Sequence, residues 1–108
     1  AGEVSVGRVE RNPELEQICK EVTKWLGTVG PINIQAIQSG DSWQILEINP
    51  RFGGGSPLSM AAGMPMDQWA ISMALNGSFP AEPPVISDHL TMMRFDDSFF
   101  YSPEELAQ

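Results

Sequence analysis

The sequence predicts an α+β fold, or an α/β layer, in which helices pack on a largely antiparallel β-sheet. Apolar residues recur at helical spacing between residues 15 and 26. Residues 31–38 and 43–49 alternate as strands do, around the turn residues Ser39-Gly40-Asp41. Two further helices and a last strand follow along the chain, so that strands and helices share one small layered structure.

The first expected strand covers residues 3–10 and is followed by a well-delimited helix. Asn12 is a suitable N-cap, Pro13 suits the first helical position, and Gly27 suits the C-terminal cap. We expect the apolar face of this helix to pack on the sheet; that face carries Leu15, Ile18, Cys19, Val22, Trp25 and Leu26.

Residues 50–56 cannot form regular structure, because Pro50 is followed by three consecutive glycines. Ser56 and Pro57 indicate the cap and first residue of a short helix that reaches Gly63. A third helix is expected from about Pro65 to Leu75, and its buried side would carry Trp69, Ala70 and Met73. Residues 78–88 are rich in proline and predict an extended connector, and residues 90–101 predict a strand, a turn at Asp96-Asp97 and a short edge segment.

Length, charge and composition exclude several classes of function. The 108 residues allow one small domain or a piece of a larger one, and the composition, 42% hydrophobic and 19% charged, is typical of a soluble globular chain. A net charge of −8 argues against nucleic acid and anionic membranes as partners, so any phosphate must be held by a local arrangement. No apolar run reaches the roughly 18–20 residues of a membrane span.

The single cysteine, Cys19, rules out an internal disulfide and favours a reducing, cytoplasmic compartment. A thiolate–imidazole pair between Cys19 and the only histidine, His89, stays open on residue types, although core packing for Cys19 and a loop position for His89 are more ordinary. Because the chain begins without methionine and enters a strand at once, we expect a cut made inside a larger protein.

Polar side chains converge at one end of the strand pair. Side chains alternate across a strand, so one face of the first strand carries Asn33, Gln35 and Ile37, and one face of the second carries Trp43, Ile45, Glu47 and Asn49. With the turn near Gly40, Gln35 lies opposite Ile45 or Glu47. We therefore expect Asn33, Gln35, Glu47 and Asn49 to meet on one face, while Leu46 and Ile48 pack on the first helix.

These residue types favour a hard cation that also binds phosphate. Glu47 offers an anionic oxygen, and Gln35 and Asn49 offer neutral ones, as Mg²⁺ prefers. The alternative is that Glu47 and Asn49 merely end a strand before Pro50.

The adjoining loop favours an anion. Arg51 is a multidentate phosphate donor, the glycines allow backbone amides to approach an anion, and Ser56 opens a helix. The alternative is a flexible loop, and the absence of a following lysine excludes a Walker A motif.

Two stretches resemble the ATP-grasp superfamily, most closely the branch around the carbamoyl phosphate synthetase large subunit. They are residues 30–35, Gly-Pro-Ile-Asn-Ile-Gln, and residues 46–56, Leu-Glu-Ile-Asn-Pro-Arg-Phe-Gly-Gly-Gly-Ser. With Gly2-Glu3 and Ala62-Gly63, the resemblance covers roughly residues 1–77. It implies the C-terminal lobe of an ATP-grasp fold, with the metal and phosphate site in residues 1–77 and a connector and last strand of the same domain in residues 78–108.

The resemblance also implies roles for individual residues. The positions matching Gln35, Glu47 and Asn49 bind Mg²⁺ or Mn²⁺, and the one matching Arg51 contacts the transferred phosphate. The remaining expected contacts to ATP are Asn33, Gly53, Gly54, Gly55 and Ser56.

The implied activity is an ATP-dependent carboxylate–amine ligase, which activates a small carboxylate as an acyl phosphate. The three glycines stand where carbamoyl phosphate synthetases usually have a stretch with serine and arginine, which favours amino acids or small carboxylates over carbamate. The family's lysine-bearing lobe would precede Ala1, so the chain alone would be inactive. The rival interpretation is a non-catalytic grasp-like module that binds a partner or is purely structural.

A chain that has lost its covering lobes should expose apolar residues and self-associate. The expected contact residues are Met60, Met64, Met66, Phe99, Phe100 and Tyr101. This surface predicts a homo-oligomer, and the alternative is a monomer with its methionines in the core.

Overall fold

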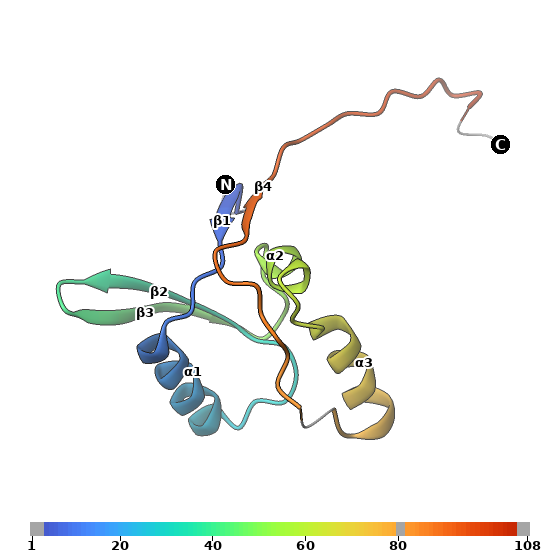
Figure 1. Ribbon diagram of the computed structural model, residues 1–108. Helices are drawn as coiled ribbons and strands as arrows, with labels where there is room; N and C mark the ends of the chain where they lie inside the picture. Colours follow the sequence, from blue (N-terminus) through green and yellow to red (C-terminus); the bar gives the residue numbers. More distant parts are fainter. Residues whose placement is uncertain (1–3, 80–81, 106–108) are drawn as a thin grey trace.

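A computed structural model describes residues 4–79 and 82–105 of the chain (Figure 1). The elements are β1 (Val6–Arg8), α1 (Pro13–Leu26), β2 (Asn33–Ser39), β3 (Ser42–Asn49), α2 (Ser56–Ala61), α3 (Met66–Asn76) and β4 (Thr91–Met93). The strands form two separate antiparallel ladders, β1 with β4 and β2 with β3. The α+β class with antiparallel pairing is therefore confirmed, although the single expected sheet is divided in two.

The β2–β3 hairpin turns at Gly40 and Asp41, as the sequence predicts. Ser39 pairs with Ser42, which leaves two residues in the turn. Gly40 has a φ of 61°, a left-handed conformation that glycine adopts without steric penalty. The turn chemistry thus fixes where the two strands begin to pair.

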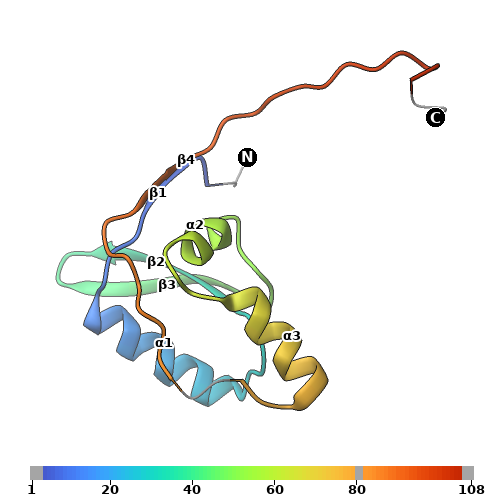
Figure 2. The same cartoon turned by 45° about the vertical axis from the view of Figure 1, so that its right-hand side comes forward.

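Helix α1 has the predicted caps. The Leu15 N–H donates to the Asn12 side chain at 3.1 Å, Pro13 is the first residue, and the Gly27 N–H donates to the Thr23 carbonyl at 3.0 Å. The helix lies along one side of the hairpin (Figures 1 and 2).

The expected burial of the apolar face of α1 is wrong for its last turn, because Trp25 is 83% exposed and no residue of α1 is buried. A two-stranded ribbon, with strands about 4.8 Å apart, is narrower than a helix of about 10 Å diameter and covers only part of its face.

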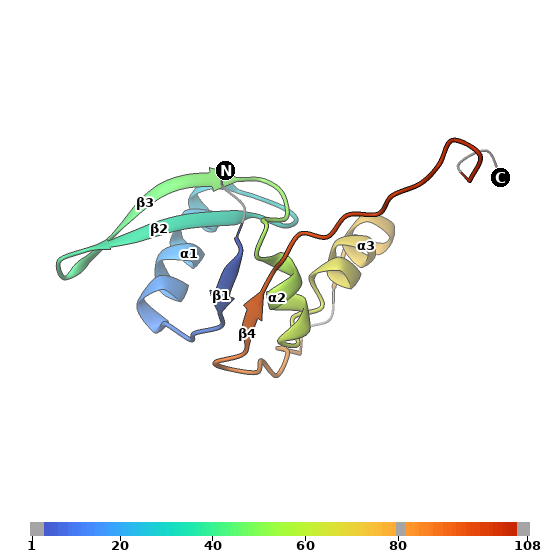
Figure 3. The same cartoon turned by 90° about the horizontal axis from the view of Figure 1, so that it is seen from above.

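The β1–β4 ladder joins the beginning of the described chain to its end. Val6 pairs with Met93 and Arg8 with Thr91, and the Arg94 N–H donates to the Ser5 carbonyl at 2.7 Å. Strand β1 is shorter than the expected residues 3–10, of which residue 3 lies outside the described residues. Strand β4 ends at Met93, and the turn expected at Asp96-Asp97 and the short edge segment after it are not formed. Residues 95–105 extend away from the body (Figures 1–3), where no neighbouring strand accepts their backbone hydrogen bonds within the part of the chain that is described.

The core is centred on α2. The buried residues within the described ranges are Ser56, Leu58 and Ala62, all on or directly after that helix. The connector passes over its end, since the Ser87 N–H donates to the Ala62 carbonyl at 2.7 Å. The radius of gyration is 17.4 Å, compared with about 13 Å for a compact chain of this length, so the fold is open.

The expected buried side of α3 is present only in part, since Trp69, Ala70 and Met73 are half-buried. The Trp69 ring stacks on that of Phe79, with ring centroids 5.8 Å apart. None of the helices within residues 4–79 and 82–105 is both long and apolar enough to cross a membrane.

Candidate metal and phosphate site

The hairpin register brings together the four polar side chains that the sequence singles out. Gln35 lies directly opposite Glu47, and Asn33 lies directly opposite Asn49. Directly opposed residues point to the same face of a ladder, with Cβ atoms about 4.5–5.5 Å apart. The expected convergence on one face, beside the loop that follows Asn49, is therefore confirmed.

A β-bulge between these pairs and the turn corrects one part of that expectation. Gln35 pairs with Glu47, but its neighbour Ala36 pairs with Ile45, so Leu46 is the extra residue. The extra residue reverses the alternation, and Trp43 and Ile45 therefore lie on the face opposite to that of Glu47. Leu46, which was expected to pack on α1, is 63% exposed, whereas Ile48 is half-buried.

The polar cluster is accessible and unsatisfied within the chain. Gln35 and Glu47 are exposed, and Asn33 and Asn49 are half-buried. Of the side-chain hydrogen bonds and ion pairs formed within the described residues, none involves these four side chains. One carboxylate and three amide oxygens on the same face are thus free to meet a ligand.

The loop after β3 folds back on the polar cluster. The Arg51 N–H donates to the Asn49 carbonyl at 2.8 Å, and the Arg51 Nη1 donates to the Phe52 carbonyl at 3.0 Å. The Asn33 side chain lies so close to Gly53 that an added Cβ would be 2.8 Å from Asn33 Cγ. Any larger residue at position 53 would therefore require the Asn33 side chain or the loop to shift.

Arg94 contacts the same loop, although this residue belongs to none of the sequence motifs described above. Its Nη2 donates to the Gly54 carbonyl at 2.8 Å, across a sequence separation of 40 residues. Gly54 also lies beside the segment that precedes β1, since an added Cβ would be 3.6 Å from the Val4 nitrogen. The sequence signal for Arg94 was weak: it is the only lysine or arginine after Arg51 in a chain of net charge −8.

Helix α2 begins one residue earlier than the sequence indicates, with Gly55 rather than Ser56 as its N-cap. The Ser56 N–H donates to the Gly53 carbonyl and the Leu58 N–H to the Gly55 carbonyl, each at 3.0 Å, and Pro57 has no N–H. Ser56 itself is 7% exposed. These bonds occupy the first backbone donors of the helix, and a phosphate contact of Ser56 stays a prediction.

Other candidates for reactive or metal-binding groups are weaker. Burial in the first place, and then the nearby Glu16 carboxylate, raise the pKa of the Cys19 thiol, which opposes thiolate formation. His89 Nε2 lies 3.7 Å from Asp88 Oδ2. Within residues 4–79 and 82–105, no three His, Cys, Asp or Glu side chains are grouped as metal ligands.

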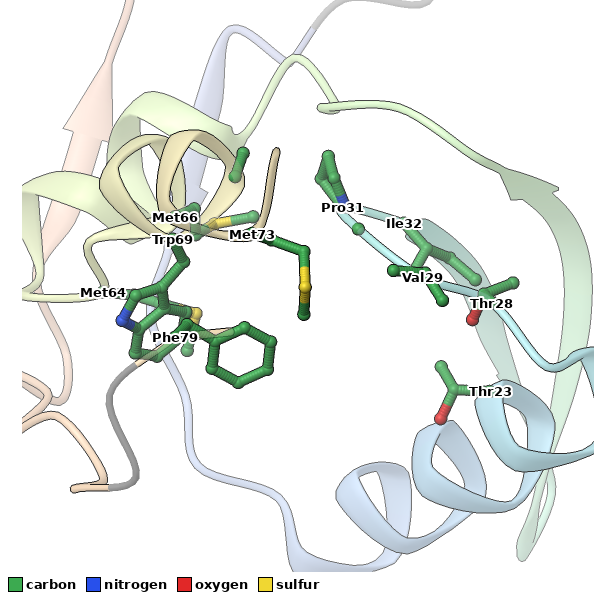
Figure 4. A pocket seen from close by; sticks show the side chains of 12 residues that line it. Thr23, Thr28, Val29, Pro31, Ile32, Met64, Met66, Trp69, Met73 and Phe79 are labelled. Carbon is green, nitrogen blue, oxygen red and sulfur yellow. The ribbon is translucent and has the colours of Figure 1, made fainter. Parts of the chain in front are cut away.

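A separate hollow of about 420 Å³ lies between α3 and the segment that joins α1 to β2 (Figure 4). Met64, Met66 and Met73 and the stacked pair of Trp69 and Phe79 line one side, and Val29, Pro31 and Ile32 line the other. None of the described residues that line it is charged. An apolar hollow of this kind suits an apolar group rather than phosphate, so it is distinct from the polar cluster on the hairpin.

Comparison of the sequence with known proteins identifies the family to which the chain belongs. Neither the curated proteins nor the solved structures gave a match. A family model described as "ATP-grasp in the biosynthetic pathway with Ter operon" matches residues 1–96, which include both ladders, the polar cluster and the glycine loop. The chain therefore belongs to this ATP-grasp family, whose fold is of the ATP-dependent ligase type.

Proposed function

We propose that the chain forms the metal and phosphate side of the active site of an ATP-dependent carboxylate–amine ligase, of the type related to the carbamoyl phosphate synthetase large subunit. The observation that carries this proposal is the pairing of Gln35 with Glu47 and of Asn33 with Asn49, with all four side chains free of internal partners among the described residues. ATP-grasp membership supplies the reaction type.

The donor set fits a divalent cation that shares its ligands with a nucleotide. Gln35, Glu47 and Asn49 would hold Mg²⁺ or Mn²⁺ through oxygen atoms, and the single carboxylate leaves room for phosphate oxygens and water. A cation bound there neutralises phosphate charge. Because the overall charge of −8 repels a nucleotide, a bound divalent cation is needed to hold the phosphates at this site.

The remaining site residues would act on the phosphates. Arg51 would stabilise charge that develops on the transferred phosphoryl group, and Asn33 and residues 53–56 would shape the surface against which the phosphates lie. In the reaction, a carboxylate oxygen of the substrate forms a bond to the γ-phosphorus of ATP while the bond to the β–γ bridging oxygen breaks, releasing ADP. An amine then attacks the acyl phosphate, loses a proton and releases phosphate.

The chain's own lysines do not complete a nucleotide site. Both lysines, Lys20 and Lys24, lie on α1 rather than on the hairpin face or the glycine loop. We therefore propose that lysines from a separate lobe contact the adenine side of ATP. The chain by itself should then bind Mg-ATP weakly and turn none of it over.

The test is formation of ADP by the full-length protein with Mg-ATP and a panel of amino acids and small carboxylates. Hydroxylamine traps any acyl phosphate as a hydroxamate. We expect carboxylate-dependent formation of ADP and hydroxamate, strongly reduced by Glu47→Ala with folding unchanged. Absence of carboxylate-dependent ADP with every substrate, together with no Mg-ATP binding, would favour the rival non-catalytic module.

A further inference from the structure

We propose that Arg94 is a positioning residue that holds the glycine loop, residues 53–55, in the conformation that meets the ATP phosphates. Its Nη2 donates to the Gly54 carbonyl at 2.8 Å. A hydrogen bond from a guanidinium is charge-assisted and stronger than one between neutral groups. The inference rests on the proposed function for its ligand, but the contact to the loop stands on its own geometry.

Arg94 can hold the glycine loop in place because its own backbone is fixed to the β1–β4 ladder. The Arg94 N–H donates to the Ser5 carbonyl at 2.7 Å, directly after the last pair of the β1–β4 ladder. The side chain is half-buried, so solvent competes less for its hydrogen bonds than at an exposed arginine. The ladder and the loop are thereby joined by one side chain.

The contact also sets the direction of a backbone donor. The described residues contain no cis peptide bond, and in a planar trans peptide the C=O of one residue and the N–H of the next point in opposite directions. Arg94 holds the Gly54 carbonyl, so the Gly55 N–H is directed away from Arg94. No backbone hydrogen bond formed within the described residues uses that N–H, which leaves it available to a ligand oxygen.

Two further contacts, made by Gly53 and Gly54, limit the space around the loop. Gly53 lies against the Asn33 side chain, and Gly54 lies beside the Val4 backbone. Neither contact fixes the rotation of the Gly54–Gly55 peptide, because neither involves its polar atoms. Among the side-chain hydrogen bonds of the described residues, the one from Arg94 to Gly54 holds a carbonyl of this loop from outside it.

The experiment compares Arg94→Met, Arg94→Lys and a matched control, Arg8→Met, in the full-length protein. Arg8 lies on the same ladder and pairs with Glu10, so its replacement changes the net charge equally without touching the loop. Two quantities are measured: the Kd of Mn²⁺–ATP by calorimetry, and hydrogen exchange of the Ser56 amide, which is bonded to the Gly53 carbonyl inside the loop.

We expect Arg94→Met to raise the Kd and accelerate Ser56 exchange, each about tenfold, with partial recovery in Arg94→Lys and no change in Arg8→Met. Arg94→Lys keeps the cation, so it remains informative if Arg94→Met fails to fold. A Kd and an exchange rate in both Arg94 variants equal to those of Arg8→Met would overturn the proposal. If the unmodified protein does not bind Mn²⁺–ATP, the proposed function fails, and the exchange rate alone then decides whether Arg94 holds the loop.

Discussion

The side-chain amide of Asn33 lies directly against Gly53, so that a Cβ at residue 53 would come within 2.9 Å of Asn33 Oδ1. Asn33 is also opposite Asn49 in the hairpin. The first residue of β2 therefore supports the glycine loop and at the same time borders the proposed metal ligands. A substitution at Asn33 should therefore alter the conformation of the loop at Gly53, and a substitution at Gly53 should displace the Asn33 side chain.

Gly53→Ala should lower the free energy of unfolding by about 1–3 kcal/mol, because the added methyl group overlaps Asn33 and one of the two must move. The matched control is Gly55→Ala, since Gly55 has a φ of −84° and a Cβ there meets nothing within 4 Å. Urea unfolding of both variants gives the comparison. Equal stability of the two alanine variants would show that the Asn33 contact is not restrictive.

The same overlap predicts non-additivity. The double variant Asn33→Ala/Gly53→Ala should lose less free energy of unfolding than the two single variants lose in sum. Removing the Asn33 amide makes room for the methyl group at residue 53. A double-mutant cycle measured by unfolding tests this, and strict additivity would contradict it.

Under the proposed function, Arg51→Ala should reduce turnover by the full-length protein about 10²–10³-fold, because it removes the charge proposed to stabilise the transferred phosphoryl group. The free energy of unfolding should change little, because the Arg51 side chain is exposed and, within the described residues, hydrogen-bonds to the neighbouring Phe52 carbonyl. Initial rates at saturating Mg-ATP provide the measurement, with Arg8→Ala as the control for charge. Turnover equal to that of the Arg8→Ala control would show that Arg51 does not take part in the reaction.

Glu16 should titrate below its ordinary pKa. The Arg11 side chain hydrogen-bonds to it with Nε–Oε1 at 2.6 Å and Nη2–Oε2 at 2.9 Å, and this bonding lowers the carboxyl pKa. Because the folded-state pKa is depressed, the pair contributes stability above the unfolded pKa and loses it as the pH falls through the folded value.

NMR titration of the Glu16 carboxyl should show its pKa rising towards the ordinary value in Arg11→Met and staying unchanged in Arg8→Met. A titration that is the same in Arg11→Met as in the unmodified chain would mean that the pair does not persist in solution.

Self-association should depend on residues 95–105. Phe99 is 79% and Phe100 is 91% exposed, whereas the three methionines expected to join them, Met60, Met64 and Met66, are half-buried. Exposed aromatic residues on an extended segment favour contact with another copy. Sedimentation across a concentration series should show an oligomer that Phe99→Ser/Phe100→Ser dissociates and Val85→Ser, at an equally exposed apolar residue of 93%, does not. A species that stays monomeric throughout would refute this.

Local chemistry made several features predictable from the sequence. Asn12, Pro13 and Gly27 delimit α1 because caps depend on a few neighbouring residues. Gly40 marks the hairpin turn, which limited the expected partner of Gln35 to Ile45 or Glu47, whereas the actual pairing with Glu47 depends on the bulge at Leu46. These predictions needed no knowledge of distant contacts.

Features decided at long range could not be predicted in the same way. The bulge at Leu46 adds one residue to β3 without a local sequence signal, and it moved Trp43 and Ile45 to the other face. Pairing of Val6 with Met93 depends on the path of all the chain between them. The bond between Arg94 and Gly54 follows from that pairing, so it was visible only in the structure.

Binding of Mn²⁺ in the presence of ATP, followed by electron paramagnetic resonance, tests the central claim that the Gln35–Glu47 pair belongs to a metal site. We compare Glu47→Gln with Asp41→Asn, which removes the same charge from the turn at the other end of the hairpin. We expect Glu47→Gln to weaken Mn²⁺ binding by about tenfold or more and Asp41→Asn to leave it unchanged. Equal Mn²⁺ affinity in the unmodified protein and both variants would contradict the assignment.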